Sequence, residues 1–315
     1  RGLDALEAVP ELLCKTHAHD IAAIHTAYIA AGAEVITTNT FSANRLKLGD
    51  KMSVEEAYRL AADCARAAGA PYIAGDIGPT GSLLEPMGTL SFDEAYDIFA
   101  EQVRAAVAAG CDIILIETMA DLREAKAALL AARENSTLPV FVTMTFGEDG
   151  RTFLGTTPEI AAEVLSSLGA QAVGFNCSLG PAELVGAAHA MASRVRCPLM
   201  AQPNAGLPHM ENGETVFDVG PEEFARAMGP LLDSGASIVG GCSGTSPSSI
   251  ELLSKELARR EKPTPRAFKP ACVLTSAQEA VVLEKGKHAV AVIGERINPT
   301  GKKRLQQALR DGDLD

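Results

Sequence analysis

One hydrophobic pattern recurs along the chain: a stretch with helical periodicity stops at glycine, and a short apolar run follows almost at once. Residues 31–36, 109–114, 168–173 and 234–239 have this pattern. Three further apolar runs begin at proline, at residues 71, 139 and 198. Short runs rich in β-branched residues predict strands, whereas apolar residues at helical spacing predict helices. The sequence therefore predicts seven strands, near residues 34, 72, 112, 139, 171, 198 and 237.

The spacing of these strands predicts the fold class. Successive strands are separated by roughly 27 to 40 residues, which suits one helix and its loops. This alternation favours an α/β fold, and we interpret it as a (β/α)8 TIM barrel. Such a barrel has eight strands, and the chain opens with a helical stretch. We therefore expect the first strand to be missing and to lie before Arg1. A seven-stranded open sheet is the alternative.

The pattern stops after about residue 257, which suggests a domain boundary. We assign residues 1–257 to the barrel and the charged, proline-rich stretch 258–288 to a linker. Residues 292–308 resemble a strand, a polar loop and the start of a helix. We expect 289–315 to be the truncated beginning of a second domain.

Composition narrows the class of protein. The net charge of −12 argues against nucleic acid or an anionic membrane surface as a partner. No apolar run approaches the roughly 18 residues needed to span a bilayer. The seven cysteines are odd in number and irregularly spaced, which favours a reducing cytoplasm over a disulfide framework. We expect a cytoplasmic protein.

The ends of the predicted strands are more polar than the strands themselves. In a TIM barrel the chemistry lies at these carboxyl ends. Helix capping accounts for Thr145 and in part for Asn39, but it does not account for a glutamate or for two cysteines. The strand-end residues are Asn39, Asp76, Glu117, Thr145, Cys177, Asn204 and Cys242.

Two of these strand ends carry thiols, which are preferred zinc ligands. Cys177 and Cys242 end strands on either side of the strand that leads to Asn204. Among the histidines, only His209 follows a strand end in a loop. Two thiolates alone make a poor zinc site, and Ser243, beside Cys242, offers a hard oxygen in place of a third. We interpret the five remaining cysteines as small buried hydrophobic residues.

Several motifs together resemble the homocysteine S-methyltransferase barrel. They occur in the family's order and extend over about residues 10 to 257. They are Thr-Asn-Thr-Phe at 38–41, Gly-Asp-Ile-Gly-Pro-Thr-Gly at 75–81, Glu-Thr-Met-Ala-Asp-Leu at 117–122, Asn-Cys-Ser-Leu-Gly-Pro at 176–181, Gln-Pro-Asn-Ala-Gly at 202–206 and Gly-Gly-Cys-Ser-Gly-Thr at 240–245. The stretch Ile-Gly-Glu-Arg-Ile-Asn-Pro-Thr-Gly at 293–301 resembles the opening of the pterin-binding barrel that follows this domain in cobalamin-dependent methionine synthases.

The resemblance implies a metal site. The family holds zinc with three cysteines, two of which match Cys177 and Cys242. The third position is Ser243 in this chain, and we expect the serine to weaken both zinc binding and methylation. In some relatives an asparagine at the position of Asn204 is the fourth ligand before the substrate arrives.

The resemblance also implies a substrate and partners. It predicts that homocysteine binds through Glu117, which would receive the amino group, with Asp76 and Asn39 as further substrate-binding residues. The methyl group would come from methylcobalamin on a separate corrinoid-binding domain or protein. Methyltetrahydrofolate would bind the pterin-binding domain in the same chain.

Two other functions remain open at this stage. The same barrel is compatible with a corrinoid-dependent methyltransferase or demethylase that acts on another methylated substrate, and the altered ligand at Ser243 would then mark the change. A non-catalytic barrel that serves as a scaffold for neighbouring domains is the second alternative. It predicts that neither metal nor small thiols bind.

Overall fold

The structure is a computed structural model that describes residues 9–211, 214–261, 272–283 and 300–312. The chain forms two compact units. The first comprises Arg1–Phe268 with Thr275–Ala280, and the second comprises Lys269–Leu274 with Val281–Asp315. The strand predicted after residue 291 lies outside the described residues. The helix predicted near residue 308 is present as α12 (Lys303–Asp311).

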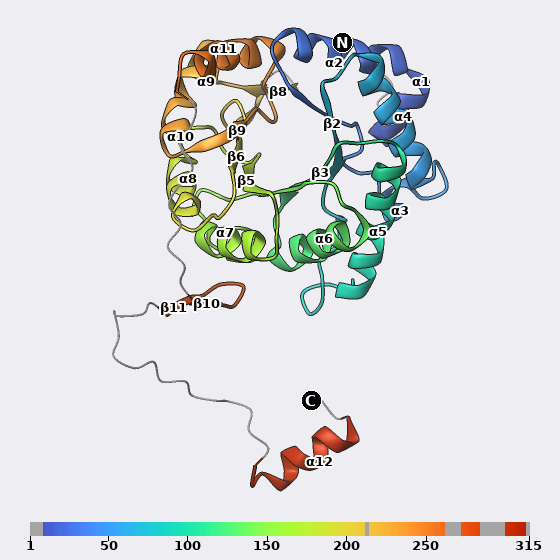
Figure 1. Ribbon diagram of the computed structural model, residues 1–315, viewed down its shortest axis with the longest axis vertical. Helices are drawn as coiled ribbons and strands as arrows, with labels where there is room; N and C mark the ends of the chain where they lie inside the picture. The colour runs from blue at the N-terminus through green and yellow to red at the C-terminus, as the bar shows by residue number, and fades with distance from the viewer. Residues whose placement is uncertain (1–8, 212–213, 262–271, 284–299, 313–315) are drawn as a thin grey trace. The chain divides into compact units, whose positions relative to one another are not determined.

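The first unit is built on one parallel sheet of seven strands, which confirms the seven predicted strands. The sheet is curled, with helices on its outer side (Figure 1). The described residues contain no pairing between its two outermost strands. The strands, in their order across the sheet, are β1 (Val35–Thr37), β2 (Tyr72–Ile77), β3 (Ile113–Met119), β4 (Val140–Met144), β5 (Ala172–Asn176), β6 (Leu199–Gln202) and β9 (Ala236–Val239).

Helices precede, connect and follow the strands of the main sheet, in the alternation that the sequence pattern predicts. They are η1 (Pro10–Leu12), α1 (Leu13–Thr16), α2 (Ala18–Ala30), α3 (Arg45–Leu48), α4 (Val54–Ala67), α5 (Phe92–Ala108), α6 (Leu122–Asn135), α7 (Pro158–Ser167), α8 (Val185–Ala192), α9 (Pro221–Ala227), α10 (Gly229–Asp233) and α11 (Pro247–Ala258). The glycine of each recurring helix-to-strand phrase has a positive φ, which ends the helix. The values are 101° at Gly32, 75° at Gly110, 92° at Gly169 and 90° at Gly235.

Two smaller sheets were not predicted in detail. Between β6 and α9 the chain forms an antiparallel hairpin of β7 (Pro208–Glu211) and β8 (Glu214–Phe217). In the stretch assigned to a linker, β10 (Cys272–Thr275) and β11 (Ala280–Leu283) form a two-stranded sheet. No helix in the described ranges is both long and apolar enough to cross a membrane.

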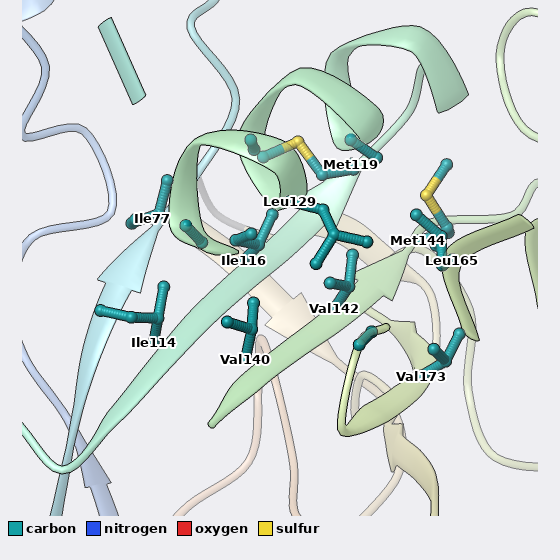
Figure 2. Close-up of a cluster of buried hydrophobic side chains, with 14 of the residues drawn as sticks. Ile77, Ile114, Ile116, Met119, Leu129, Val140, Val142, Met144, Leu165 and Val173 are labelled. Carbon is teal, nitrogen blue, oxygen red and sulfur yellow. The ribbon is translucent and has the colours of Figure 1, made fainter. Parts of the chain in front are cut away.

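The main core lies between the sheet and its helices. Figure 2 shows Ile116 of β3 and Val142 of β4 beside Leu129 of α6 in this cluster. Burial of each such aliphatic side chain contributes about 1.5 to 3 kcal/mol. The residues with the opposite orientation along the strands form a second cluster, on the inner face of the curled sheet. It contains Ala74, Ile113, Leu115 and Met200, with Phe141 and Ile238 packed against it.

Candidate functional site

The inner face of the sheet changes from apolar to polar at the carboxyl ends of its strands. Side chains of a strand alternate between the two faces, so the residue two positions after an inner one is also inner. Asp76 follows Ala74 in this way, and Gln202 follows Met200. The resulting polar layer consists of Asp76, Glu117, Thr143, Asn176 and Gln202.

A β-bulge in β3 sets the direction of Glu117. Ile116 pairs with Val142 and Met119 pairs with Met144. Glu117 and Thr118 therefore lie opposite the single residue Thr143. Such a bulge re-aims side chains and interrupts the alternation. Met119 is consequently buried with the helix-facing residues, although it is two positions after Glu117.

The buried side chain of Asn176 connects the bulge to the end of β5. Its Oδ1 accepts hydrogen bonds from the backbone N–H of Thr118 (2.8 Å) and from the hydroxyl of Thr143 (2.7 Å). Its Nδ2 donates to the hydroxyl of Thr118 (2.7 Å). Asn176 is 1% exposed, so these bonds are shielded from water. The residue before Cys177 is thus tied to the residue after Glu117.

Backbone hydrogen bonds hold the last three strand ends together. The N–H of Cys177 donates to the carbonyl of Gln202 (3.0 Å), and the N–H of Cys242 donates to that of Pro203 (2.9 Å). The N–H of Ser243 donates to Oδ1 of buried Asn204 (3.1 Å). Cys177 itself has a φ of 63°, a left-handed conformation that is uncommon outside glycine. The three strand ends therefore meet in a defined and partly strained arrangement.

The thiol of Cys177 lies at the centre of this arrangement. It accepts hydrogen bonds from the Cys242 thiol, the Ser243 hydroxyl and the Asn204 amide. The Cys242 bond has the largest effect, and together with a bond from the backbone N–H of Ser178 these bonds lower the pKa of Cys177 to about 6 despite partial burial. The same bond raises the pKa of Cys242, which keeps its proton.

This donor set suits zinc with one thiolate fewer than a three-cysteine site. The side chains of Cys177 and Cys242 lie together with that of Asn204, and thiolates are preferred zinc ligands. Ser243 supplies only a hydroxyl and is exposed. Within the described ranges, no group of three or more His, Cys, Asp or Glu side chains gathers as a metal site. His209, the other candidate, instead has its Nδ1 3.4 Å from a carboxylate oxygen of Asp218.

Carboxyl groups lie on the other side of the site. Burial raises the pKa of Glu117 to about 7, and the charge of Cys177 adds to this effect. Burial also raises the pKa of Asp76, followed in importance by the charges of Glu117 and Glu11. One buried oxygen of Asp76 and one of Glu11 have no hydrogen-bond partner. Such a cluster lacks hydrogen-bond donors, and a cationic ligand would supply them.

The structure brings most of the predicted site residues together. Asp76 and Glu117 interact electrostatically, and so do Glu117 and Cys177. Asn39 is placed differently, because its Nδ2 donates to the carbonyl of Pro10 (2.9 Å) and to the thiol of Cys14 (3.5 Å). The backbone N–H of Thr145 donates a hydrogen bond to the carbonyl of Met119 (2.9 Å).

Five residues of the site were not predicted from the sequence: Glu11, Thr118, Thr143, Asn176 and Gln202. The signal for Asn176 and Gln202 was their position, since each is a polar residue at an inner-face position of a strand. One buried oxygen of Gln202 has no hydrogen-bond partner, so it also faces the site unsatisfied. The roles of Glu11 and Thr118 had no comparable signal.

A sequence model of the family described as homocysteine S-methyltransferase matches residues 4–257. The chain belongs to this family. The match spans the polar layer and the converging strand ends. It confirms the resemblance found in the sequence and makes the chain a member of a family of methyltransferases.

Two mycobacterial proteins named methionine synthase are similar to this family member. The protein of Mycobacterium leprae (strain TN) is 32% identical over 327 residues, and that of Mycobacterium tuberculosis (strain ATCC 25618 / H37Rv) is 31% identical over 322 residues. Each match covers 96% of this chain but only 27% of the relative. The chain thus spans about a quarter of the length of these curated relatives.

Solved structures of the homocysteine methyltransferase MmuM from Escherichia coli have the same fold. The oxidized form matches with a TM-score of 0.70 at 19% identity, and the metallated form with 0.68 at 20%. Each match covers 81% of this chain and 91% of the MmuM chain. At this level of identity, the likeness shows the fold alone.

Proposed function

We propose that the chain catalyses zinc-dependent transfer of a methyl group from methylcobalamin to the thiol of homocysteine, which gives methionine. The convergence of Cys177, Cys242 and Asn204 opposite the carboxyl groups of Glu117 and Asp76 carries this proposal. A ligand with a thiol at one end and an ammonium group at the other matches both sides of the site. The names of the mycobacterial and Escherichia coli relatives support the same substrate.

Zinc would be held by the sulfurs of Cys177 and Cys242, with Asn204 as a further ligand. A bound zinc ion keeps a coordinated thiol deprotonated at neutral pH and so makes its sulfur available as a nucleophile. The contribution of the protein is to orient the ligands. The bond from Ser243 N–H to Asn204 Oδ1 and the left-handed backbone of Cys177 support such a role.

The carboxyl groups would bind the ammonium group of the substrate. Glu117 and Asp76 are inner-face acceptors, and one oxygen of Asp76 has no partner within the protein. Charge-assisted hydrogen bonds of this kind are shorter and stronger than neutral ones. Asn39 was predicted to bind substrate as well. Asn39 follows the end of β1, but its amide already bonds to Pro10 and Cys14. We therefore infer that it supports the site without binding the substrate directly.

The methyl donor would come from outside this barrel. We infer that a corrinoid-binding domain or protein presents methylcobalamin, and that residues 289–315 open a pterin-binding domain which takes methyltetrahydrofolate. The greater length of the mycobacterial relatives supports such additional domains. We further infer an eighth strand between β1 and β9, since both are edge strands of the described sheet and natural sheets usually cover their edges.

Zinc content tests the proposal directly. The protein and its Ser243→Cys variant are supplemented with zinc and compared by elemental analysis and by methionine formation from homocysteine and methylcobalamin. Because serine is a poor replacement for a thiolate, we expect about one zinc per chain in the variant, much less in the parent, and faster turnover in the variant.

The control is Ser237→Cys, which adds a thiol at an exposed position of β9 and should change neither quantity. Full zinc and equal turnover in parent and Ser243→Cys would contradict the three-thiolate arrangement. If neither protein held zinc or bound homocysteine, the enzymatic proposal would fail in favour of a scaffold.

A further inference from the structure

We propose that Asn176 and Thr118 are positioning residues that set the distance between the amine-binding and sulfur-binding sides of the site, and so select homocysteine over shorter thiol amino acids. This inference rests on the proposed function. We call the pair of side-chain and backbone bonds between these two residues the Asn176–Thr118 clamp. It joins the residue after Glu117 to the residue before Cys177.

The clamp has one orientation. The backbone N–H of Thr118 can only donate, so the atom of Asn176 that receives it must be Oδ1. Nδ2 is then left to donate to the Thr118 hydroxyl at 2.7 Å. The hydroxyl of Thr143 donates to Oδ1 as well, from the neighbouring strand. Every polar atom of this buried amide therefore has a partner.

The backbone on both sides of the clamp is in an unfavourable conformation. Thr118, Cys177 and Ser178 have φ values of 59°, 63° and 64°. These are the only non-glycine residues with positive φ among the described residues. A β-branched residue such as Thr118 is rare in this region, and such strain persists only where surrounding structure holds it. The clamp supplies that restraint at the bulge that aims Glu117.

A fixed separation selects ligand length. Homocysteine has one methylene more between its thiol and its α-carbon than cysteine has. If Glu117 takes the ammonium group and the sulfur binds beside Cys177, cysteine cannot reach both groups without moving one of them. One methylene is worth roughly 10- to 200-fold in discrimination where the site is rigid. A site with a loose Glu117 would lose most of this factor.

Two threonine-to-valine changes separate positioning from simple packing. Thr118→Val and Thr143→Val have the same shape as the parent residues, and each removes one hydroxyl bond to Asn176. Only Thr118 lies on the bulge with Glu117. Thr118→Ser restores the hydroxyl and serves as the rescue. If Thr118→Val fails to fold, Thr118→Ala removes the same hydroxyl with less strain.

The measurement is the ratio of the dissociation constants for L-cysteine and L-homocysteine, obtained by calorimetry on zinc-supplemented protein, with zinc content determined in parallel. We expect a ratio of roughly 10 or more in the parent, Thr118→Ser and Thr143→Val, and a fall toward 1 in Thr118→Val at unchanged zinc content. If the parent holds too little zinc, all variants are made in the Ser243→Cys chain.

An unchanged ratio in folded Thr118→Val would overturn the inference, as would an equal fall in Thr143→Val, which would indicate general loosening. These outcomes leave the proposed function intact, because homocysteine still binds. Failure of both the parent and Ser243→Cys to bind homocysteine would overturn the proposed function and the inference with it.

Discussion

At the scale of single residues, Asp76 is a carboxyl group held where water cannot solvate its charge. It is 5% exposed, and its peptide group is fixed by bonds from Tyr58 (2.7 Å) and Thr40 (2.8 Å) to its carbonyl. The side chain has no comparable support, since one oxygen has no partner. Burial of this carboxyl group disfavours its charged form, and titratable groups with such perturbed pKa values are common at ligand-binding sites.

This burial predicts how stability depends on pH. The folded state raises the pKa of Asp76, so it retains the proton at pH values where the unfolded chain has lost it. Between the two pKa values the unfolded state binds fewer protons, and the free energy of unfolding falls as pH rises, by up to about 1.4 kcal/mol per pH unit. Asp76→Asn cannot titrate. Its stability relative to the parent should therefore increase with pH.

Urea unfolding of the parent and Asp76→Asn between about pH 4 and pH 8 measures the difference in their free energies of unfolding. The pH range begins near the ordinary pKa of aspartate, where the unfolded chain starts to lose this proton. Asp50→Asn, at an exposed position, is the control and should keep the slope of the parent. The same slope in Asp76→Asn would show that the carboxyl is not held protonated.

The sequence revealed some site residues and not others for a physical reason. Cys177, Cys242 and Glu117 stand at strand ends, and parallel strands present their carboxyl ends at one edge. Their grouping could therefore be predicted from position alone. Thr118 could not, because its role depends on a left-handed backbone that its side chain disfavours. Asn39 was predicted to bind substrate, but its contacts with Pro10 and Cys14 depend on how the N-terminal helices fold back.

At the scale of elements, the approach of β6 to β5 depends on Gly174. A Cβ atom at this position would lie 1.8 Å from the carbonyl oxygen of Met200, its partner in the sheet register. We expect Gly174→Ala to lower the free energy of unfolding by about 1 to 3 kcal/mol, because the backbones of β5 and β6 must separate to make room for the methyl group.

Gly186 gives the matched comparison. It lies within α8, and a Cβ there would meet nothing within 4 Å. Gly186→Ala should raise stability by about 0.5 to 1 kcal/mol, because alanine restricts the unfolded chain and favours the helix. Chemical denaturation followed by circular dichroism tests both variants. Equal effects of the two changes would contradict the predicted contact across β5 and β6.

Helices and strands were predicted best where a single sequence pattern determines them. The strands of the main sheet carry short apolar runs, and four of them follow a glycine that ends the preceding helix and is visible in the sequence, at Gly32, Gly110, Gly169 and Gly235. The β7–β8 hairpin was missed because its strands are short and polar, as in His209 and Glu211. The bulge in β3 was missed because the alternation is hidden in the all-apolar run from Ile113 to Ile116.

At the scale of the whole molecule, the family match ends at residue 257, close to the end of α11. The first unit nevertheless includes Thr275–Ala280. Two bonds attach this short segment: the Thr156 hydroxyl donates to the carbonyl of Ala277 (2.7 Å), and Gln278 Nε2 donates to that of Leu154 (3.0 Å). A segment assigned to a linker by composition thus contacts the loop between β4 and α7.

A chain that ends at residue 261 tests how far the fold around the seven-stranded sheet depends on the C-terminal residues 262–315. It loses the two bonds to Leu154 and Ala277, each worth about 0.5 to 1.5 kcal/mol, so its free energy of unfolding should fall by about 1 to 3 kcal/mol. Zinc content and homocysteine affinity should stay within about twofold of the full chain, since the loss acts on stability and not on the strand ends. Gln278→Ala in the full chain, which removes one of the two bonds, should show about half of this loss. If the shortened chain unfolds without cooperativity or no longer binds homocysteine, the fold around this sheet requires residues beyond α11, and the site cannot be attributed to the matched region alone.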